Sequence, residues 1–255
     1  MEPGPDRGTV VWADLGTYDV VASQEFYRRV FGWDFEEFAS PEGSYYAAQL
    51  DGAPVGGMME FSEEEAQTAM PSMWTVFIGT DDIDADVTRV AELGGAVLRP
   101  PFEIPGGERI AVVSDPTGST FAIATFGETA GGRMRWNRTG SMCWAECQTR
   151  DQDTAIDFYE RLFGWKASRT DTYTVFDMNG QPVAGLMGMP PMVPDEVPSH
   201  WFLYVLVDEL EAAGDAVTDA GGQILVAPSD IEDGRFAVVE DSAGAVFGLF
   251  QAMPD

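Results

Sequence analysis

Two stretches of this sequence begin alike, and they decide the fold. The first is VVWADLGTYDVVASQEFYRRVFGW, residues 10–33, and the second is MCWAECQTRDQDTAIDFYERLFGW, residues 142–165. Both contain Trp-Ala-acid, then Thr, then Asp, then Phe-Tyr and Phe-Gly-Trp, at the same spacing. A match of this length within one chain predicts an internal duplication.

The match continues along both halves of the chain. DGAPVGGMM at 51–59 parallels NGQPVAGLM at 179–187, and ERIAVVSDPTGSTFAIATF at 108–126 parallels GRFAVVEDSAGAVFGLFQA at 234–252. Repeats this long are domains rather than the small units of a solenoid. We therefore predict an N-terminal domain at residues 1–126, a linker at 127–139 and a C-terminal domain at 140–255.

Each half contains the same pattern of secondary structure twice. Residues 9–16 alternate as a strand does, and residues 23–31 predict a short helix that ends at Gly32. Asp81-Asp82 opens a second helix that Gly94-Gly95 closes, and D-G and D-P-T-G turns mark hairpins. The chain is thus predicted to be α+β, with four βαβββ modules.

Composition limits the class of protein and its partners. A hydrophobic content of 45% over 255 residues favours a folded core, and the formal net charge of −29 repels nucleic acid and anionic membranes. No apolar run reaches the roughly 18 residues of a membrane span, and the N-terminal sequence does not resemble a signal peptide, so we expect a cytoplasmic protein. Cys143 and Cys147 fall four apart in a predicted strand, which is too far for a mutual disulfide, and we expect buried thiols.

The order of these motifs resembles the vicinal oxygen chelate superfamily, the group of glyoxalases, bleomycin-resistance proteins and extradiol dioxygenases. FYRRVFGW, DDIDA, GG and DPTGSTFAI carry the resemblance, which covers residues 8–126 and 140–252. The tandem arrangement is similar to a group of actinobacterial proteins described as hydroxylase-like or glyoxalase-like. The resemblance implies that paired modules form two cups, each a half-barrel of strands with helices outside and the ligand on the concave face.

The resemblance also implies where a metal would be held, and those positions lack suitable side chains. Metal-dependent members use His or Gln from the first strand of each module and Glu from the last strand. The corresponding positions here are Trp12, Thr75, Ala122, Trp144, Phe202 and Gly248, with the middle hairpins near residues 56–58 and 184–186. Divalent cations need oxygen, nitrogen or thiolate donors that converge, so we expect no metal and no cofactor.

Strand alternation predicts which side chains line each cup. Most of them are apolar or aromatic, which suits a flat organic molecule of medium size. The first cup is predicted to contain Trp12, Asp14, Met58, Met73, Thr75, Phe77 and Ala122, and the second Trp144, Glu146, Leu186, His200, Phe202, Tyr204, Gly248 and Phe250. Small residues at Ala122 and Gly248 are expected to leave space for the ligand. The alternative is that the two tryptophans fill the cups as core.

Three of these residues are candidates for catalysis. Asp14 or Glu146 could act as a general base if an apolar cup raises its pKa, and His200 could pair with Glu146 for proton transfer. The alternative places each carboxylate at a wet rim or beside an arginine such as Arg109 or Arg235. In the same way, a histidine near the start of a strand is often simply solvated.

The sequence favours a metal-free binding protein for a hydrophobic or aromatic small molecule. Such a protein would act in antibiotic resistance or natural-product biosynthesis, as a monomer or homodimer, with neither nucleic acid nor membrane as a partner. The alternative is a cofactor-free enzyme of secondary metabolism, such as a cyclase or isomerase, that uses a carboxylate base. A third possibility is an interaction scaffold whose cups are filled by side chains.

Overall fold

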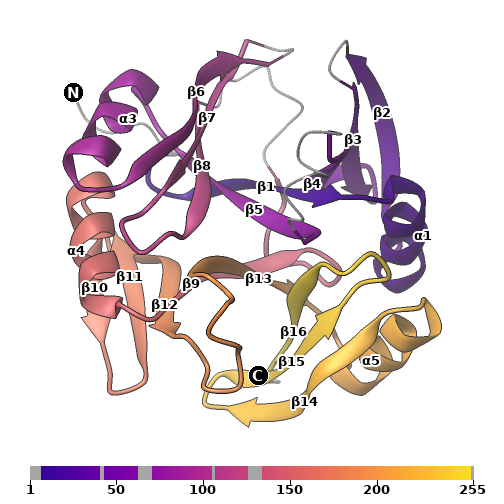
Figure 1. Ribbon diagram of the computed structural model, residues 1–255. Helices are drawn as coiled ribbons and strands as arrows, with labels where there is room; N and C mark the ends of the chain where they lie inside the picture. Colours follow the sequence, from indigo (N-terminus) through magenta and orange to yellow (C-terminus); the bar gives the residue numbers. More distant parts are fainter. Residues whose placement is uncertain (1–6, 41–42, 63–70, 105–106, 126–133, 254–255) are drawn as a thin grey trace. The chain divides into compact units, whose positions relative to one another are not determined.

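The computed structural model of the protein describes residues 7–40, 43–62, 71–104, 107–125 and 134–253. Within these residues, each half of the chain runs strand, helix, three strands, twice over (Figure 1). The prediction of an α+β chain with four βαβββ modules is confirmed. Residues 127–133 of the expected linker lie outside the described ranges.

The first half forms one mixed eight-stranded sheet with two helices in the described residues. The strand order in the sheet is β2-β3-β4-β1-β5-β8-β7-β6. The elements are β1 (Val10–Thr17), α1 (Val20–Phe31), β2 (Asp34–Ser40), β3 (Gly43–Leu50), β4 (Ala53–Glu60), β5 (Met73–Gly79), α3 (Ile83–Glu92), β6 (Ala96–Glu103), β7 (Arg109–Ser114) and β8 (Thr120–Ala124).

The second half repeats this sheet. Its strand order is β10-β11-β12-β9-β13-β16-β15-β14. The elements are β9 (Met142–Thr149), α4 (Gln152–Phe163), β10 (Lys166–Arg169), β11 (Tyr173–Met178), β12 (Gln181–Gly188), β13 (His200–Leu206), α5 (Leu210–Asp219), β14 (Gln223–Ile231), β15 (Gly234–Glu240) and β16 (Val246–Ala252).

The Asp and the Gly of the repeated string set the ends of the first helix in each half. The side chain of Asp19 accepts a hydrogen bond from the Ala22 amide, so α1 begins at Val20, three residues before the predicted start. Gly32 ends α1 at a φ of 74°, in the left-handed region that glycine adopts without strain. Asp151 and Gly164 do the same for α4.

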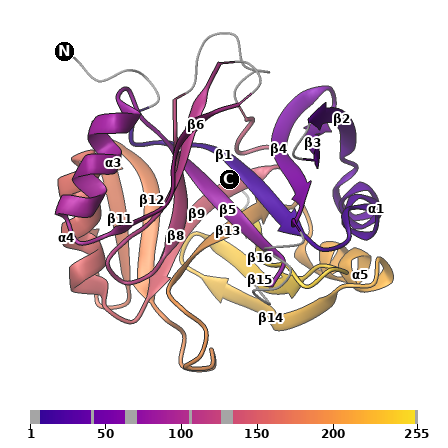
Figure 2. The same cartoon turned by 45° about the horizontal axis from the view of Figure 1, so that its top comes forward.

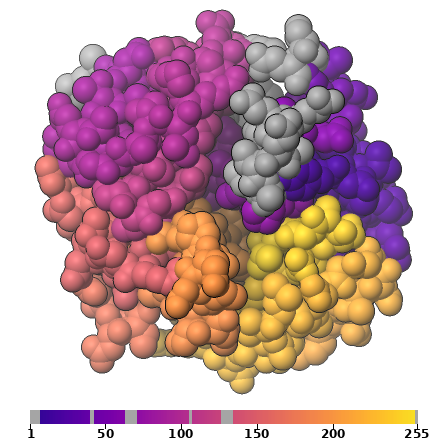
Figure 3. All heavy atoms as spheres, viewed as in Figure 1, coloured from indigo at the N-terminus to yellow at the C-terminus, as the bar shows by residue number. Residues whose placement is uncertain are grey.

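The chain forms two compact units, and these do not coincide with the two halves of the sequence. Unit 1 contains Met1–Val11, Thr75–Gly132 and Ala145–Phe202, and unit 2 contains Trp12–Trp74, Arg133–Trp144 and Leu203–Asp255. Each unit therefore combines one module of the first half with one of the second. In unit 1, α3 lies beside α4, and in unit 2, α1 lies beside α5 (Figures 1 and 2). Figure 3 shows the magenta residues of the first half against the salmon residues of the second half in unit 1.

The tyrosine of the repeated Phe-Tyr pair is the centre of the core in each unit. In unit 2, the buried ring of Tyr27 stacks on Trp33, with ring centroids 4.9 Å apart and planes at 13°. Its hydroxyl donates to Asp241 Oδ2 at 3.1 Å and accepts from Trp74 Nε1 at 3.0 Å. Asp241 comes from the D-S-A-G turn of the other half, so this contact joins the halves within the unit.

Unit 1 repeats this arrangement with the roles of the halves exchanged. Tyr159 stacks on Trp165 with centroids 5.5 Å apart, and its hydroxyl donates to Asp115 Oδ2 at 3.0 Å and accepts from Trp201 Nε1 at 3.0 Å. Asp115 belongs to the D-P-T-G turn of the first half. In each half, the repeated string therefore packs against residues of the other half.

The tryptophan of Phe-Gly-Trp makes a second link of the same kind. Trp33 Nε1 donates to the Gly140 carbonyl at 2.7 Å, and Trp165 Nε1 donates to the Gly8 carbonyl at 2.8 Å. Both indole rings are buried, and a buried N–H without an acceptor would cost about 1–3 kcal/mol. These bonds fix the segment that precedes the first strand of each half.

The two cysteines form no disulfide with each other. Cys147 is buried and Cys143 is half-buried, and both are free thiols, which agrees with the expectation of no mutual disulfide. Burial raises the pKa of the Cys143 thiol to about 12. Among the helices of the described residues, none is long and apolar enough to span a membrane.

Candidate functional site

The first strand of the N-terminal half places an aromatic ring and a carboxylate side by side in unit 2. Trp12 and Asp14 are two residues apart on β1, and Trp12 Nε1 donates to Asp14 Oδ1 at 2.7 Å, which confirms that they share a face of the strand. The Tyr45 hydroxyl, from β3, donates to the same oxygen at 2.8 Å and lies 2.9 Å from Trp12 Nε1. These three residues form what we call the Trp12–Asp14–Tyr45 cluster.

A glycine on the strand between them makes this cluster possible. Gly57 on β4 pairs with Asp14 on β1 and with Ala47 on β3. A Cβ atom at this position would overlap both the Tyr45 hydroxyl oxygen and Asp14 Oδ1. Only a residue without a side chain leaves room there for Tyr45 to reach Asp14.

The Asp14 carboxylate is buried, and its proton affinity changes as a result. Its exposed fraction is 7%. Burial raises the pKa of Asp14 to about 6, although the hydrogen bonds from Tyr45 and Trp12 oppose the shift. The alternative of a wet rim or an arginine partner is wrong for this residue, because Arg109 pairs with Asp84 and Arg235 with Glu211 and Asp230.

Unit 1 contains a related cluster from the second half. Glu146 on β9 is 2% exposed, and the Tyr173 hydroxyl from β11 donates to its Oε2 at 2.7 Å. Gln148 Nε2 donates to Glu146 Oε1 at 2.9 Å. In this Glu146–Gln148–Tyr173 cluster, Gln148 lies on the same strand as Glu146. Tyr173 comes from the β11–β12 hairpin beside that strand.

The comparisons with known proteins agree with this fold. The profile of the Glyoxalase/Bleomycin resistance protein/Dioxygenase superfamily matches residues 9–123 and again residues 142–249. The chain belongs to this superfamily. The superfamily resemblance predicted from the repeated motifs is thereby confirmed.

Relatives from actinobacteria match the chain over nearly its whole length, CFP32 and DnrV among them. CFP32 of Mycobacterium tuberculosis, named as a candidate glyoxylase, is 35% identical over 97% of this chain and 96% of its own. DnrV of Streptomyces peucetius, named as an anthracycline biosynthesis protein, is 32% identical over 96% of this chain and 93% of its own.

Among solved structures, the fold is similar to that of the Mn(II)-bound glyoxalase from Novosphingobium aromaticivorans. The TM-score is 0.66 at 16% identity, over 96% of this chain and 82% of that one. The 2,3-dioxygenase LapB from Pseudomonas sp. KL28 gives a TM-score of 0.64 at 13% identity, over 97% of this chain and 94% of that one. At these identities the likeness concerns the fold alone.

The residues of this superfamily member do not fit the metal of its metal-dependent relatives. The positions implied by the resemblance carry Trp12, Thr75, Ala122, Trp144, Phe202 and Gly248, and the hairpin positions at 56–58 and 184–186 carry glycine, alanine, methionine and leucine. In the described part of the chain, no group of three His, Cys, Asp or Glu side chains converges. Of the six strand positions only Thr75 has an oxygen in its side chain, so they do not supply the converging donors that a divalent cation needs.

The other predicted lining residues differ in how far they are exposed. Trp12, Met73, Thr75, Trp144, Tyr204 and Phe250 are half-buried, whereas Met58, Phe77, Ala122, Leu186 and Phe202 are buried. The expectation of open space at Gly248 is wrong, because a Cβ there would overlap the ring of Tyr204. Tyr204 and Gly248 are partners in the parallel pairing of β13 and β16, so the neighbouring side chain covers the glycine.

His200 and Glu146 do not form the pair that was one candidate for proton transfer. His200 Nδ1 lies 2.9 Å from the Pro198 carbonyl, and burial lowers the pKa of the imidazole. The hydrogen bonds of Glu146 described above go to Tyr173 and Gln148 instead. This arrangement does not provide a proton-transfer couple.

The two tyrosines that donate to the carboxylates, Tyr45 and Tyr173, were not among the site residues predicted from the sequence. The signal was present, because the alignment that pairs residues 51–59 with 179–187 also pairs Tyr45 with Tyr173. The sequence predicts strands at both tyrosines. It does not predict which strand lies beside β1 or β9. The parallel pairs β1–β4 and β9–β12 bring the adjoining strands β3 and β11 within reach of Asp14 and Glu146.

Proposed function

We propose that the protein binds a hydrophobic or aromatic small molecule against the Trp12–Asp14–Tyr45 cluster. The observation that carries the proposal is the buried carboxyl group of Asp14, which lies between two aromatic side chains and has a pKa raised to about 6. Small-molecule sites combine apolar and aromatic side chains with a few oriented polar groups, and this cluster contains both kinds. A metal has no part in this proposal.

The cluster suits a planar ligand that carries a hydroxyl or amino group. The half-buried indole of Trp12 offers a face for stacking, and aromatic pairs contribute about 0.5–1.5 kcal/mol beyond their buried area. A ligand donor bonded to Asp14 would form a charge-assisted hydrogen bond at neutral pH. The name of the relative DnrV associates it with anthracyclines, which are planar polycyclic aromatics bearing hydroxyl groups, and this supports a ligand of that class.

A fluorescence titration with a hydroxyanthraquinone tests the binding. We expect the ligand to quench tryptophan emission, and Trp12→Phe to remove a large part of the quenching. Asp14→Asn should weaken binding about tenfold, because it removes the charge from the hydrogen bond. Glu146→Gln is the matched control, since it makes the same chemical change in the other cluster.

The outcomes separate the proposals. Equal affinities for the wild type, Trp12→Phe and Asp14→Asn would show that the cluster is not the site. A loss confined to Glu146→Gln would move the site to the second cluster. No binding by any planar aromatic would favour the scaffold, whose cups are filled by side chains.

The second candidate is a cofactor-free enzyme that uses Asp14 as a general base. The raised pKa favours it, because a base is most effective when its pKa lies near the working pH. Incubation with candidate aromatic ligands, followed by mass spectrometry, tests for a product. Catalysis requires that Asp14→Asn stops product formation while binding persists, and an unchanged ligand in the wild type would count against an enzyme.

A further inference from the structure

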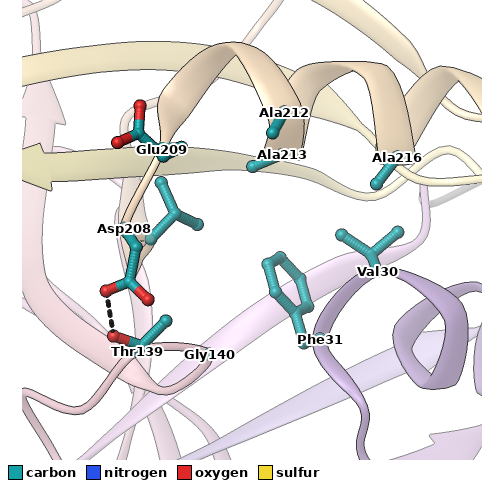
Figure 4. A pocket seen from close by; sticks show the side chains of 10 residues that line it. Val30, Phe31, Thr139, Gly140, Asp208, Glu209, Ala212, Ala213 and Ala216 are labelled. Carbon is teal, nitrogen blue, oxygen red and sulfur yellow. Dashed lines mark hydrogen bonds between the residues drawn. The ribbon is translucent and has the colours of Figure 1, made fainter.

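A pocket of about 330 Å³ lies in unit 2, between helices α1 and α5. Its walls include Phe31 from the end of α1 and Ala213 and Ala216 from α5, which point toward one another in Figure 4. At one end, Asp208 Oδ1 accepts a hydrogen bond from the Thr139 hydroxyl at 2.5 Å. None of its lining residues belongs to the Trp12–Asp14–Tyr45 cluster.

Because the chain is duplicated, unit 1 contains a place that corresponds to this pocket of unit 2, and the two can be compared. Gly8 of unit 1 and Gly140 of unit 2 occupy equivalent positions, because each carbonyl accepts the indole N–H of the Phe-Gly-Trp string in its own unit. Each also has a positive φ, of 69° and 80° respectively. The residues just before these glycines, Arg7 and Thr139, are therefore equivalent as well.

In unit 1, a guanidinium group occupies the place that corresponds to the pocket. Arg7 Nη1 and Nη2 bind Asp86 Oδ2 and Oδ1 at 2.6 and 3.0 Å, and Nη1 lies 3.4 Å from Thr80 Oγ1. Arg7 Nη2 also lies 3.4 Å from the Leu162 carbonyl, in the last turn of α4. A positive charge at the end of a helix is stabilised by the helix dipole.

In unit 2, every side chain of this arrangement has been replaced. The repeat alignment sets Thr139 against Arg7, Val207 against Thr80 and Ala213 against Asp86. Both members of the ion pair are absent together, and the residues that replace them are smaller or apolar. The pocket is the space that this exchange leaves, and Thr139, Val207 and Ala213 all line it.

The remaining polar groups favour a positive charge in this space. Val30 and Phe31 end α1, so the carbonyl groups of its last turn and the negative end of its dipole are at the pocket. The Asp208 carboxylate adds a full negative charge at one end. Glu209, at the start of α5, offsets the positive end of that helix, although its carboxylate points away from the pocket in Figure 4.

The basic side chains of α1 are engaged with other groups. Arg28 lies 3.7 Å from Glu25 and over the ring of Phe35, and Arg29 Nη2 donates to the Asp219 carbonyl at 2.8 Å. No lysine or arginine is among the lining residues of this pocket. The chain as a whole, with a formal net charge of −29, also attracts cations.

We propose that this pocket binds a small organic cation, an amidinium, guanidinium or ammonium group carried on a short apolar body. The cation takes the place that the Arg7 guanidinium fills in unit 1, near the last carbonyl groups of α1 and Asp208. The apolar body packs against Phe31, Ala213 and Ala216. A volume of about 330 Å³ is at the small end of the range for ligand pockets.

Benzamidine is a suitable probe, because it joins a planar cation to one aromatic ring. A titration followed by amide NMR spectra of the labelled full chain should move the signals of Gly140 and Ala213. Neutral benzamide has the same shape, and we expect it to bind about tenfold more weakly because it lacks charge-assisted hydrogen bonds. Benzoate should not bind. Equal affinities for benzamidine and benzamide would overturn the proposal.

Variants locate the site. T139R/A213D rebuilds the ion pair of unit 1 inside unit 2, so it should fill the pocket and abolish benzamidine binding. Ala216→Leu narrows the pocket without new charge and gives a second test should the double variant not fold. Asp208→Asn should weaken binding several-fold through loss of a charged partner.

Two results would refute this assignment. Full benzamidine affinity in both T139R/A213D and Ala216→Leu would show that the pocket is not the site. Loss of the shifts in Asp14→Asn would place benzamidine at the Trp12–Asp14–Tyr45 cluster. The proposed aromatic binding at that cluster is measured with a different ligand, so either proposal can fail alone.

Discussion

The Asp14→Asn variant should make the folded protein more stable at neutral pH. The folded-state pKa of about 6 lies roughly 2 units above the ordinary value of 3.8, and each unit corresponds to about 1.4 kcal/mol. Because the pKa of Asp14 is higher in the folded state, binding of its proton stabilises the folded protein. This contribution is fully present below pH 3.8 and is lost as the pH rises through about 6. Between pH 4 and pH 7.5, the free energy of unfolding of the wild type should therefore fall by roughly 3 kcal/mol relative to that of the variant.

The hydrogen bonds of the cluster do not obscure this effect. Trp12 and Tyr45 both donate to Oδ1, and asparagine keeps an oxygen that can accept from them. Charge repulsion across this acidic chain also changes with pH, but it affects both proteins. Asp171→Asn removes an exposed carboxylate and corrects for the change in net charge.

Urea unfolding at closely spaced pH values, followed by circular dichroism, measures the difference. The unfolding free energies of wild type and Asp14→Asn should diverge between pH 4 and 6.5 and run parallel above that. A difference that stays constant over this range, or that follows Asp171→Asn, would falsify the assignment of a raised pKa to Asp14.

Three further predictions concern side chains whose partners are defined. Tyr45→Phe removes a hydrogen bond that lowers the pKa of Asp14, so the pH-dependent loss of stability should move to higher pH in the same titration. Tyr27→Phe and Tyr159→Phe each leave a buried indole N–H and a buried carboxylate without one partner. Each variant should therefore lower the free energy of unfolding in urea by about 1–3 kcal/mol. A change near zero for both would contradict the role of the repeated tyrosine. Arg7→Thr alone should destabilise the protein by up to about 3 kcal/mol because Asp86 stays buried without its charge partner, whereas R7T/D86A, which copies unit 2, should recover most of that loss. Additive effects in this double-mutant cycle would mean that the ion pair is not coupled.

Much of the fold could be predicted because its signals are local. Asp19 and Gly32 cap a helix through their own side chain and backbone conformation, and the duplication shows the same residues again at Asp151 and Gly164. The prediction placed the start of α1 three residues late, because Val20 to Ala22 do not mark a helix by composition and only the Asp19 cap defines the boundary. The face shared by Trp12 and Asp14 followed from strand alternation.

The sites were predicted less completely, for a physical reason. A carboxylate on a known face has no defined chemistry until its partners are known, and the partner of Asp14 is Tyr45, 31 residues away on a strand it does not pair with. That the expected metal positions lack the family's ligands could be read from residue identities alone. The lack of open space at Gly248 could be predicted only from the pairing of β13 with β16, which places the ring of Tyr204 over the glycine.

The sequence by itself determined the duplication, the four modules, the superfamily and the lack of ligands at the expected metal positions, because each is written in residue identity and spacing. Only the tertiary structure decided that Tyr27 and Trp33 bond to residues of the second half and Tyr159 and Trp165 to residues of the first. The halves are so alike that the sequence allows each string to pack within its own half or against the other. The choice depends on contacts between residues more than 40 positions apart, which local patterns do not encode. The same contacts place Arg7 against Asp86 in unit 1 and leave a pocket at the corresponding place in unit 2.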